Sequence, residues 1–267
     1  MIMYTRLVMI KVGRTSQGAR SGGTYVHVSP RRSAGDERRT GVLIVRLVPM
    51  AGRHCAPVHP CVRQDRGVHD YEVLSSQTVF QGRVIGLVRD EVSMPGGTTS
   101  FRDVVVHPGA VGVVALREGG AGWEVLLVTQ YRHPVRRRLD ELPAGLLDVP
   151  GEPSVDAARR ELAEEAGLAA GTWHVLADAL TSPGMSDEAI RLFLARDVEQ
   201  TPRDVQEHEE LEMTSRWVLL SEAVRRVLAG ELENAMACLG VLAAEVAVRD
   251  GFTGLRPADA PWPARTR

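Results

Sequence analysis

The stretch RRELAEEAGL, residues 159–168, combines three glutamates with two arginines and then reaches a glycine. The sequence around it predicts a helix over 154–166. Ser154 follows a proline and is suited to cap the first turn, where Asp156 would meet the positive end of the helix dipole. Gly167 is suited to the left-handed residue that ends a helix. The stretch is therefore expected to be the second half of a well-bounded helix.

The predicted helix has an apolar face and an acidic edge. At about 100° per residue, the apolar arc consists of Val155, Ala158 and Leu162. Glu161 and Glu165 are four positions apart and stack along one edge of this arc, whereas Glu164 lies near the opposite side. Because carboxylates at this spacing repel, a cation is expected between them. Two interpretations stay open: a salt-bridged surface using Arg159 or Arg160, and a site for hard divalent cations, which prefer oxygen ligands.

Length and composition permit one large globular domain and exclude several classes of protein. The chain has 267 residues, of which 44% are hydrophobic, and this suffices for a packed core. A net charge of −2 gives no general attraction to nucleic acid, so a phosphate-bearing ligand must be bound by local charge. The three cysteines are too scattered for disulfides or zinc. With neither a membrane-spanning run nor a signal-peptide pattern, we expect a cytoplasmic protein without a membrane partner.

Composition divides the chain into three parts. Residues 1–70 are basic, rich in glycine and serine, and without a sustained period, so we expect a disordered extension, although GVLIVRLV at 41–48 could add a strand. Residues 71–250 mix β-rich runs with helical stretches, which predicts an α/β domain of about 180 residues. Its N-terminal strand part is expected at 71–108. Residues 251–267 contain proline and arginine without a period, and we expect a tail.

Runs rich in β-branched residues predict strands on both sides of the acidic helix. Before the helix they are QTVFQGRVIGLVRDEV (77–92), TTSFRDVVVHPGAVGVVAL (98–116) and WEVLLVTQYR (123–132). After it they are WHVLADAL (173–180), AIRLFLARDV (189–198) and TSRWVLL (214–220). Two final helices are predicted to begin at Ser221 and Asn234.

The acidic helix and the loop before it resemble the Nudix box, G-x5-E-x7-R-E-U-x-E-E-x-G-U, where U is aliphatic. From Glu152 to the end of the box the match is complete. At the front, Gly145 lies seven positions before Glu152 instead of six, so the loop GLLDVPGE carries one extra residue. Three flanking stretches resemble the ADP-ribose pyrophosphatases of this family: QYRHPVRRRLDELPAGLLD (130–148), TSPGMSDEAIRLFLA (181–195) and EHEELEMTSRWV (207–218). The resemblance covers about residues 76–250.

The resemblance implies both a fold and an activity. The implied fold is a mixed β-sheet sandwiched between helices, with an N-terminal antiparallel strand region used in homodimerisation. The implied activity is metal-dependent hydrolysis of the pyrophosphate bond of ADP-ribose, or of a related nucleoside diphosphate sugar, to AMP and a sugar phosphate. The implied ligands of Mg²⁺, or of Mn²⁺ in its place, are the carbonyl of Ala144 and the carboxylates of Glu161, Glu164 and Glu165. Glu152 and Arg160 would form a supporting ion pair that orients these ligands.

Further roles follow from the same resemblance. Hydrolysis needs charge neutralisation on the diphosphate and an activated water, and divalent cations provide both. Besides Glu165, which would act through the metal, the catalytic candidates are the acidic-loop residues Glu207, the favoured general base, and Glu209, the second choice. Arg132 ends a strand, where its guanidinium is suited to grip the diphosphate. The other implied substrate contacts are Glu188 at the terminal ribose, Glu141 near the loop and Arg102, which would reach the partner's site in a homodimer.

Three alternatives to this activity stay open. A Nudix hydrolase of nucleoside triphosphates or dinucleotides would share the box, although the stretch at 181–188 argues against it. A non-catalytic ADP-ribose-binding module could use the same scaffold, but such a module could lose the metal-binding carboxylates, and all of them are retained here. Nucleic-acid binding through residues 1–70 would depend steeply on salt, and we do not expect it.

Overall fold

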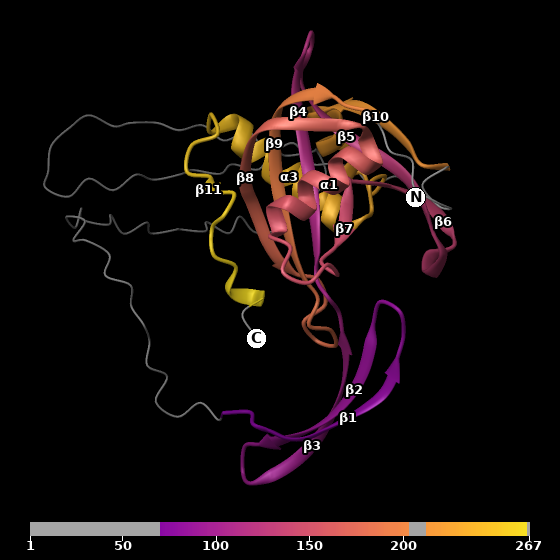
Figure 1. Cartoon of the computed structure of the whole chain (residues 1–267), viewed down its shortest axis with the longest axis vertical. Coiled ribbons are helices and arrows are strands. Elements are labelled where there is room, and N and C mark those ends of the chain that lie inside the picture. The colour runs from indigo at the N-terminus through magenta and orange to yellow at the C-terminus, as the bar shows by residue number, and fades with distance from the viewer. Residues whose placement is uncertain (1–69, 203–211, 266–267) are drawn as a thin grey trace, which may run out of the picture. The chain divides into compact units, whose positions relative to one another are not determined.

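The computed structural model describes residues 70–202 and 212–265 (Figure 1). The predictions for residues 1–69, including the strand at 41–48, lie outside the described residues. In chain order the strands and α-helices are β1 (Val73–Gln81), β2 (Gly86–Met94), β3 (Thr98–Val106), β4 (Ala110–Gly119), β5 (Gly122–Arg132), β6 (Arg137–Glu141), β7 (Ala144–Leu146), α1 (Ser154–Ala166), β8 (Leu168–Leu180), β9 (Ala189–Gln200), β10 (Thr214–Leu219), α2 (Leu220–Leu228), α3 (Ala235–Arg249) and β11 (Arg256–Pro257). Within this part of the chain, no helix is long and apolar enough to cross a membrane.

The larger of two sheets has eight strands. Its order is β10-β5-β4-β9-β8-β11, with β6 paired to β5 and β7 paired to β4. Strands β4 and β9 run parallel, with Ala110 opposite Ile190, and the remaining pairs are antiparallel. The predicted mixed sheet is therefore confirmed.

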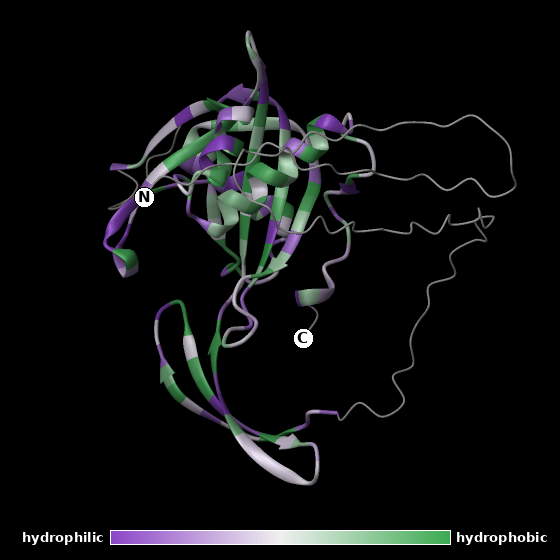
Figure 2. Cartoon of the chain, turned by 180° about the vertical axis from the view of Figure 1, so that it is seen from behind, coloured by the Kyte–Doolittle hydropathy of each residue, from purple (hydrophilic) through white to green (hydrophobic). Residues whose placement is uncertain are grey.

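Side chains of the central strands β4 and β9 alternate between two hydrophobic clusters. The first cluster includes Val111, Val113, Phe193 and Ala195 together with Ala157, Ala158 and Leu162 of α1. The second includes Val114, Leu116, Leu192 and Leu194 together with Ala223 of α2 and Val241 of α3. Because successive side chains of a strand point to opposite faces, α1 covers one face of the sheet and α2 and α3 cover the other. Figure 2 shows hydrophobic residues concentrated on these central strands.

Helix α1 has the predicted bounds but not the predicted cap. Pro153, in an extended conformation, is the N-cap residue and makes no side-chain hydrogen bond, so Ser154 is the first helical residue and the expectation that it caps was wrong. Gly167 adopts the left-handed conformation with φ 62° and donates its N–H to the carbonyl of Ala163, as predicted. At α3, the side chain of Asn234 accepts a hydrogen bond from the N–H of Ala237 at 2.9 Å.

Strands β1, β2 and β3 form a separate antiparallel sheet. Its link to the segment between β8 and β9 consists of two backbone hydrogen bonds: Val105 donates to Met185 at 2.8 Å, and Asp187 donates to Val105 at 3.2 Å. Several large apolar side chains of this sheet are exposed, and Phe101, at 63%, is an example. The antiparallel strand region is thus as predicted, and its use in dimerisation stays a prediction.

The segment after α3 differs from the expected tail. Trp262 is buried in the first hydrophobic cluster, and β11 pairs with β8. The buried guanidinium of Arg191 on β9 donates to the carbonyls of Ala260 and Pro261 at 2.7 and 3.0 Å and lies over the ring of Trp262. Arg191 also donates two hydrogen bonds to Asp178 at 2.8 and 3.0 Å. Packing around one buried cation therefore orders a segment that has no periodic pattern.

We predict that the Asp178–Arg191 pair makes the stability of the protein sensitive to acid. Burial alone would raise the pKa of Asp178, but hydrogen bonds from Arg191 and Arg256 outweigh it and the pKa is lowered. A carboxyl group with a lowered folded pKa stabilises the protein above its unfolded pKa near 4, and this contribution is lost as pH falls through the folded pKa. Asp178→Asn leaves the buried Arg191 without its anion, so the Tm should fall at pH 7 by the equivalent of about 3 kcal/mol.

The measurement is thermal unfolding of wild type and Asp178→Asn from pH 7 to pH 3. The difference in Tm should be largest at pH 7 and shrink towards pH 3, because the carboxyl takes up a proton in the unfolded chain before it does so in the folded one. A difference that stays constant with pH would contradict this role of Asp178.

Candidate active site

The centre of the candidate site is the contact between β7 and α1. The carboxylate of Glu161 lies so close to Gly145 that a Cβ atom at position 145 would be only 1.9 Å from Oε1 of Glu161. Beside it, the backbone N–H of Ala144 donates to Oε2 of Glu165 at 3.0 Å, and Glu165 is buried. Since any side chain at position 145 would displace Glu161, the sequence requires glycine there. Strand β7 is thereby held against two of the three predicted carboxylate ligands.

Arg160 is the cation expected among the carboxylates. It donates to both oxygens of Glu152 at 3.2 Å, to Glu161 at 2.7 Å and to Glu164 at 3.1 Å. The hydrogen bond with Glu152 is the main reason that the pKa of Arg160 is raised above its usual range. Arg159, the other candidate, pairs instead with Asp156 at 2.7 Å. The expected ion pair of Glu152 and Arg160 is therefore present, and the same guanidinium offsets part of the negative charge of Glu161 and Glu164.

The donor chemistry of this cluster fits a hard divalent cation. Within the described ranges, no group of three His, Cys, Asp or Glu side chains is already arranged as a set of metal ligands, since Arg160 engages Glu161 and Glu164. The available donors are nonetheless carboxylate oxygens next to the backbone of Ala144, which is the oxygen-rich chemistry that such ions prefer. The missing side chain of Gly145 leaves room at this point for the Glu161 carboxylate.

Arg132 and Glu141 form a second charged pair. Arg132 is the last residue of β5, and it donates to both oxygens of the buried Glu141 at 3.0 and 2.7 Å. The side chain of Arg132 remains 43% exposed. A two-point hydrogen bond to a buried carboxylate fixes the plane of a guanidinium, so Glu141 holds Arg132 in one orientation. These two predicted site residues are brought together.

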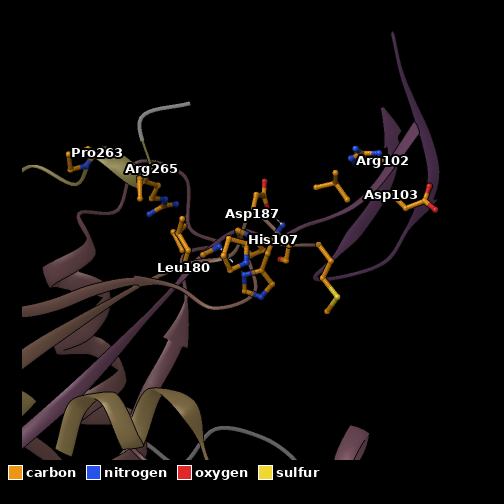
Figure 3. A pocket seen from close by; sticks show the side chains of 16 residues that line it. Arg102, Asp103, His107, Leu180, Asp187, Pro263 and Arg265 are labelled. Atoms are coloured by element: carbon orange, nitrogen blue, oxygen red, sulfur yellow. Dashed lines mark hydrogen bonds between the residues drawn. The ribbon is translucent and has the colours of Figure 1, made fainter. Parts of the chain in front are cut away.

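Glu188 lies at the end of the loop between β8 and β9. Its carboxylate accepts a hydrogen bond from the hydroxyl of Thr181, and its other oxygen is 3.7 Å from Nε2 of His107. The adjoining loop and the β3–β4 linker line a cavity of about 670 Å³, in which His107 and Asp187 lie next to each other (Figure 3). Arg102 lines the same cavity from β3, where it donates to Ser100 at 2.6 Å and to the carbonyl of Phe101 at 2.9 Å.

Comparison with known proteins identifies the family of this chain. The NUDIX domain model matches residues 106–237. The chain is also 50% identical over 194 residues to a protein named ADP-ribose pyrophosphatase from Mycobacterium tuberculosis, which covers 73% of the chain and 92% of that relative. The chain belongs to the Nudix family. It is a Nudix pyrophosphohydrolase, and the enzymes of this family generally depend on divalent metal ions.

Two further relatives extend the comparison. An ADP-ribose pyrophosphatase of Bacillus subtilis is 34% identical over 172 residues, covering 64% of this Nudix chain and 90% of that protein. A solved structure titled as an ADP compounds hydrolase superposes with a TM-score of 0.60 at 20% identity, covering 70% of this chain and 99% of the other. At that identity the superposition supports the Nudix fold alone.

The Nudix loop ends in a tight turn before α1. Glu152 donates its N–H to the carbonyl of Val149 at 3.2 Å, and Gly151 adopts a positive φ of 79°. Helix α1 still begins at Ser154, so the insertion leaves the ligand-bearing helix in place.

Two predicted residues are not covered by the structure, and two residues near the site were not predicted from the sequence. The general-base candidates Glu207 and Glu209 fall outside the described residues. His107 and Arg265 were not predicted, although Arg265 donates to the carbonyl of Leu147 on the Nudix loop at 3.2 Å. The only sequence signal at His107 is that the segment HPG breaks a β-rich run. The partner of its ring lies about eighty residues later, and no local pattern could reveal it.

We predict that Gly145→Ala weakens divalent-metal binding in this Nudix domain without unfolding it. The new methyl group would push away the carboxylate of Glu161, which is the end of a flexible side chain and can move without disturbing the backbone. Isothermal titration calorimetry with Mg²⁺ or Mn²⁺ should show affinity reduced about tenfold or more, since a ligand would be displaced. The Tm should change little.

Gly171→Ala on β8 is the matched control. A Cβ atom there would meet only Asp197, at an ordinary contact distance of 3.4 Å. If Gly145→Ala and Gly171→Ala bound metal equally well, the packing of Glu161 against Gly145 would have no part in metal binding.

Proposed function

We propose that this Nudix hydrolase splits the pyrophosphate bond of ADP-ribose, or of a related nucleoside diphosphate sugar, into AMP and a sugar phosphate. The observation that carries the proposal is the 50% identity with the M. tuberculosis ADP-ribose pyrophosphatase over 92% of its length. The carboxylates around Gly145 support catalysis rather than ligand binding alone, because a non-catalytic module has no need of Glu161 and Glu165 beside β7.

Metal binding is assigned to β7 and α1. In this proposal the Ala144 carbonyl, Glu161 and Glu165 hold Mg²⁺, for which Mn²⁺ can substitute, and Glu164 is a further ligand. When bound, the divalent cation would neutralise charge on the diphosphate and activate the attacking water. The ion pair of Arg160 with Glu152 keeps the acidic side chains grouped before the cation arrives.

The remaining residues bind substrate and move a proton. Arg132, oriented by Glu141, pairs with the diphosphate, and Glu188 accepts hydrogen bonds from hydroxyl groups of the terminal ribose. Water adds to one phosphorus atom, the bond from that phosphorus to the bridging oxygen breaks, and the bridging oxygen leaves with the other phosphate. Glu207, or Glu209 as second choice, takes the proton of the water.

We predict that Glu165→Gln abolishes most of the hydrolysis of ADP-ribose. The amide can still accept the hydrogen bond from the N–H of Ala144, but it has no charge for a divalent cation. The kcat should fall about a hundredfold or more, and the Tm should stay near that of wild type. AMP release from ADP-ribose with Mg²⁺ measures the change.

Two comparisons give this experiment its controls. Glu245→Gln changes an exposed glutamate of α3 and should leave turnover unaltered. Wild type should release AMP from ADP-ribose faster than it hydrolyses 8-oxo-dGTP. Faster hydrolysis of 8-oxo-dGTP would show that the substrate is a nucleoside triphosphate. Full activity of Glu165→Gln would refute the role of Glu165 in metal binding.

We also propose that the three-stranded sheet pairs two copies of the chain. Val79, Phe80 and Phe101 are each more than half exposed, and a single chain gains nothing by exposing such side chains on one small sheet. Arg102 on the same sheet would then reach the active site of the partner. A cytoplasmic location and the absence of a nucleic-acid partner stay predictions.

We predict that Phe80→Asp combined with Phe101→Asp converts a dimer into monomers. Two desolvated carboxylates would replace apolar contacts at the interface, which is strongly unfavourable. Light scattering coupled to size exclusion should report half the mass of wild type. Thr98→Asp adds the same charge to β3 at an exposed polar position on the opposite face of the sheet and should stay dimeric. A monomeric wild type would overturn the proposal.

A further inference from the structure

The backbone of His107 is fixed between two parts of the domain. Its N–H donates to the carboxylate of Asp187 at 2.9 Å, next to the two backbone hydrogen bonds that join Val105 to the loop between β8 and β9. These bonds tie the linker to the loop that carries Glu188. The side chain of His107 is 13% exposed, so it is largely enclosed yet still reaches the cavity at this loop (Figure 3).

One ring nitrogen of His107 is occupied by the linker itself. Nδ1 accepts a hydrogen bond from the backbone N–H of Gly109 at 3.1 Å. Gly109 has a positive φ of 86°, and a Cβ atom there would lie 3.1 Å from the carbonyl oxygen of Ala189, so this backbone path requires glycine. A nitrogen that accepts a hydrogen bond carries no proton, and the ring proton therefore lies on Nε2.

The protonated nitrogen faces Glu188. Nε2 is 3.7 Å from Oε1 of Glu188, and Oε2 of the same carboxylate accepts from the hydroxyl of Thr181. The Thr181 hydroxyl therefore donates to one oxygen of the carboxylate, and the N–H of His107 faces the other oxygen from 3.7 Å, just beyond hydrogen-bonding distance. The side chain of Glu188 remains 29% exposed and open to a ligand. In this tautomer His107 can donate a proton in a hydrogen bond but cannot act as a base.

We propose that His107 is a positioning residue, which holds the carboxylate of Glu188 in the orientation that accepts the hydroxyl groups of the substrate's sugar. The inference rests on the proposed function, in which Glu188 contacts the terminal ribose. It adds a residue that the resemblance to ADP-ribose pyrophosphatases did not assign and gives each ring nitrogen a separate task.

Two variants separate the tasks of the two nitrogens. His107→Asn places an amide oxygen where Nδ1 accepts from Gly109 but loses the donor towards Glu188. His107→Gln extends an amide N–H towards Glu188 but loses the acceptor for Gly109. We expect His107→Asn to keep its Tm and to raise the KM for ADP-ribose about tenfold, with little change in kcat. We expect His107→Gln to lower the Tm while keeping the KM within about threefold.

The control is His174→Asn, a histidine of β8 outside the site, which should leave the KM unchanged. Glu188→Gln should raise the KM as His107→Asn does, and the double variant should be no worse than either single one, because both remove the same interaction. If Glu188→Gln raised the KM and His107→Asn did not, the inference would be overturned while the proposed function stood. An unchanged KM in Glu188→Gln would overturn both the inference and the ribose contact.

A measurement without substrate keeps the test independent of the activity. In ¹⁵N-labelled protein, the ring of His107 should show its proton on Nε2, and the Nε2 resonance should shift in Glu188→Gln. A ring protonated on Nδ1, or an Nε2 resonance that does not shift in Glu188→Gln, would overturn the inference. This holds even if ADP-ribose proved not to be the substrate.

Discussion

The contact of the Glu161 carboxylate with the bare backbone of Gly145 is the constraint around which the site is organised. A strand of three residues, β7, has little to hold it in place by itself. It is fixed by β4 on one side and by the carboxylates of Glu161 and Glu165 on the other. The packing of α1 against β7 therefore depends on the absence of a side chain at position 145, and a methyl group there would displace the Glu161 carboxylate.

Charge balance complements this steric constraint. The carboxylates of Glu152, Glu161 and Glu164 would repel each other, and Arg160 relieves this repulsion through hydrogen bonds to each of them. The same logic recurs at a distance from the box: Glu141 holds Arg132, and Asp178 holds Arg191. In each case a buried or half-buried ion has a partner of opposite sign, as desolvation demands.

Features with a local signature could be predicted from the sequence, and features built by distant contacts could not. Helix α1 has the predicted bounds because Gly167 and the apolar arc through Leu162 are visible within a few turns. The N-cap was misplaced by one residue, since Pro153 already takes the extended conformation that precedes a helix. The segment after α3 is ordered by its contacts with Arg191, and the role inferred for His107 depends on its contact with Glu188. Because the partners are far apart in the chain, no periodic pattern could have predicted either feature.

The environment of Arg191 bears on how the protein completes its folding during synthesis. Arg191 lies on a central strand, yet two of its hydrogen-bond acceptors come 69 and 70 residues later in the chain. Until the ribosome has released that stretch, Arg191 can pair with Asp178 but lacks its two carbonyl acceptors, and water must take their place. Domains generally begin to fold from the N-terminal side during synthesis. In this protein the first hydrophobic cluster is complete only after Trp262 has been synthesised, so we expect the last step of folding to follow its release from the ribosome.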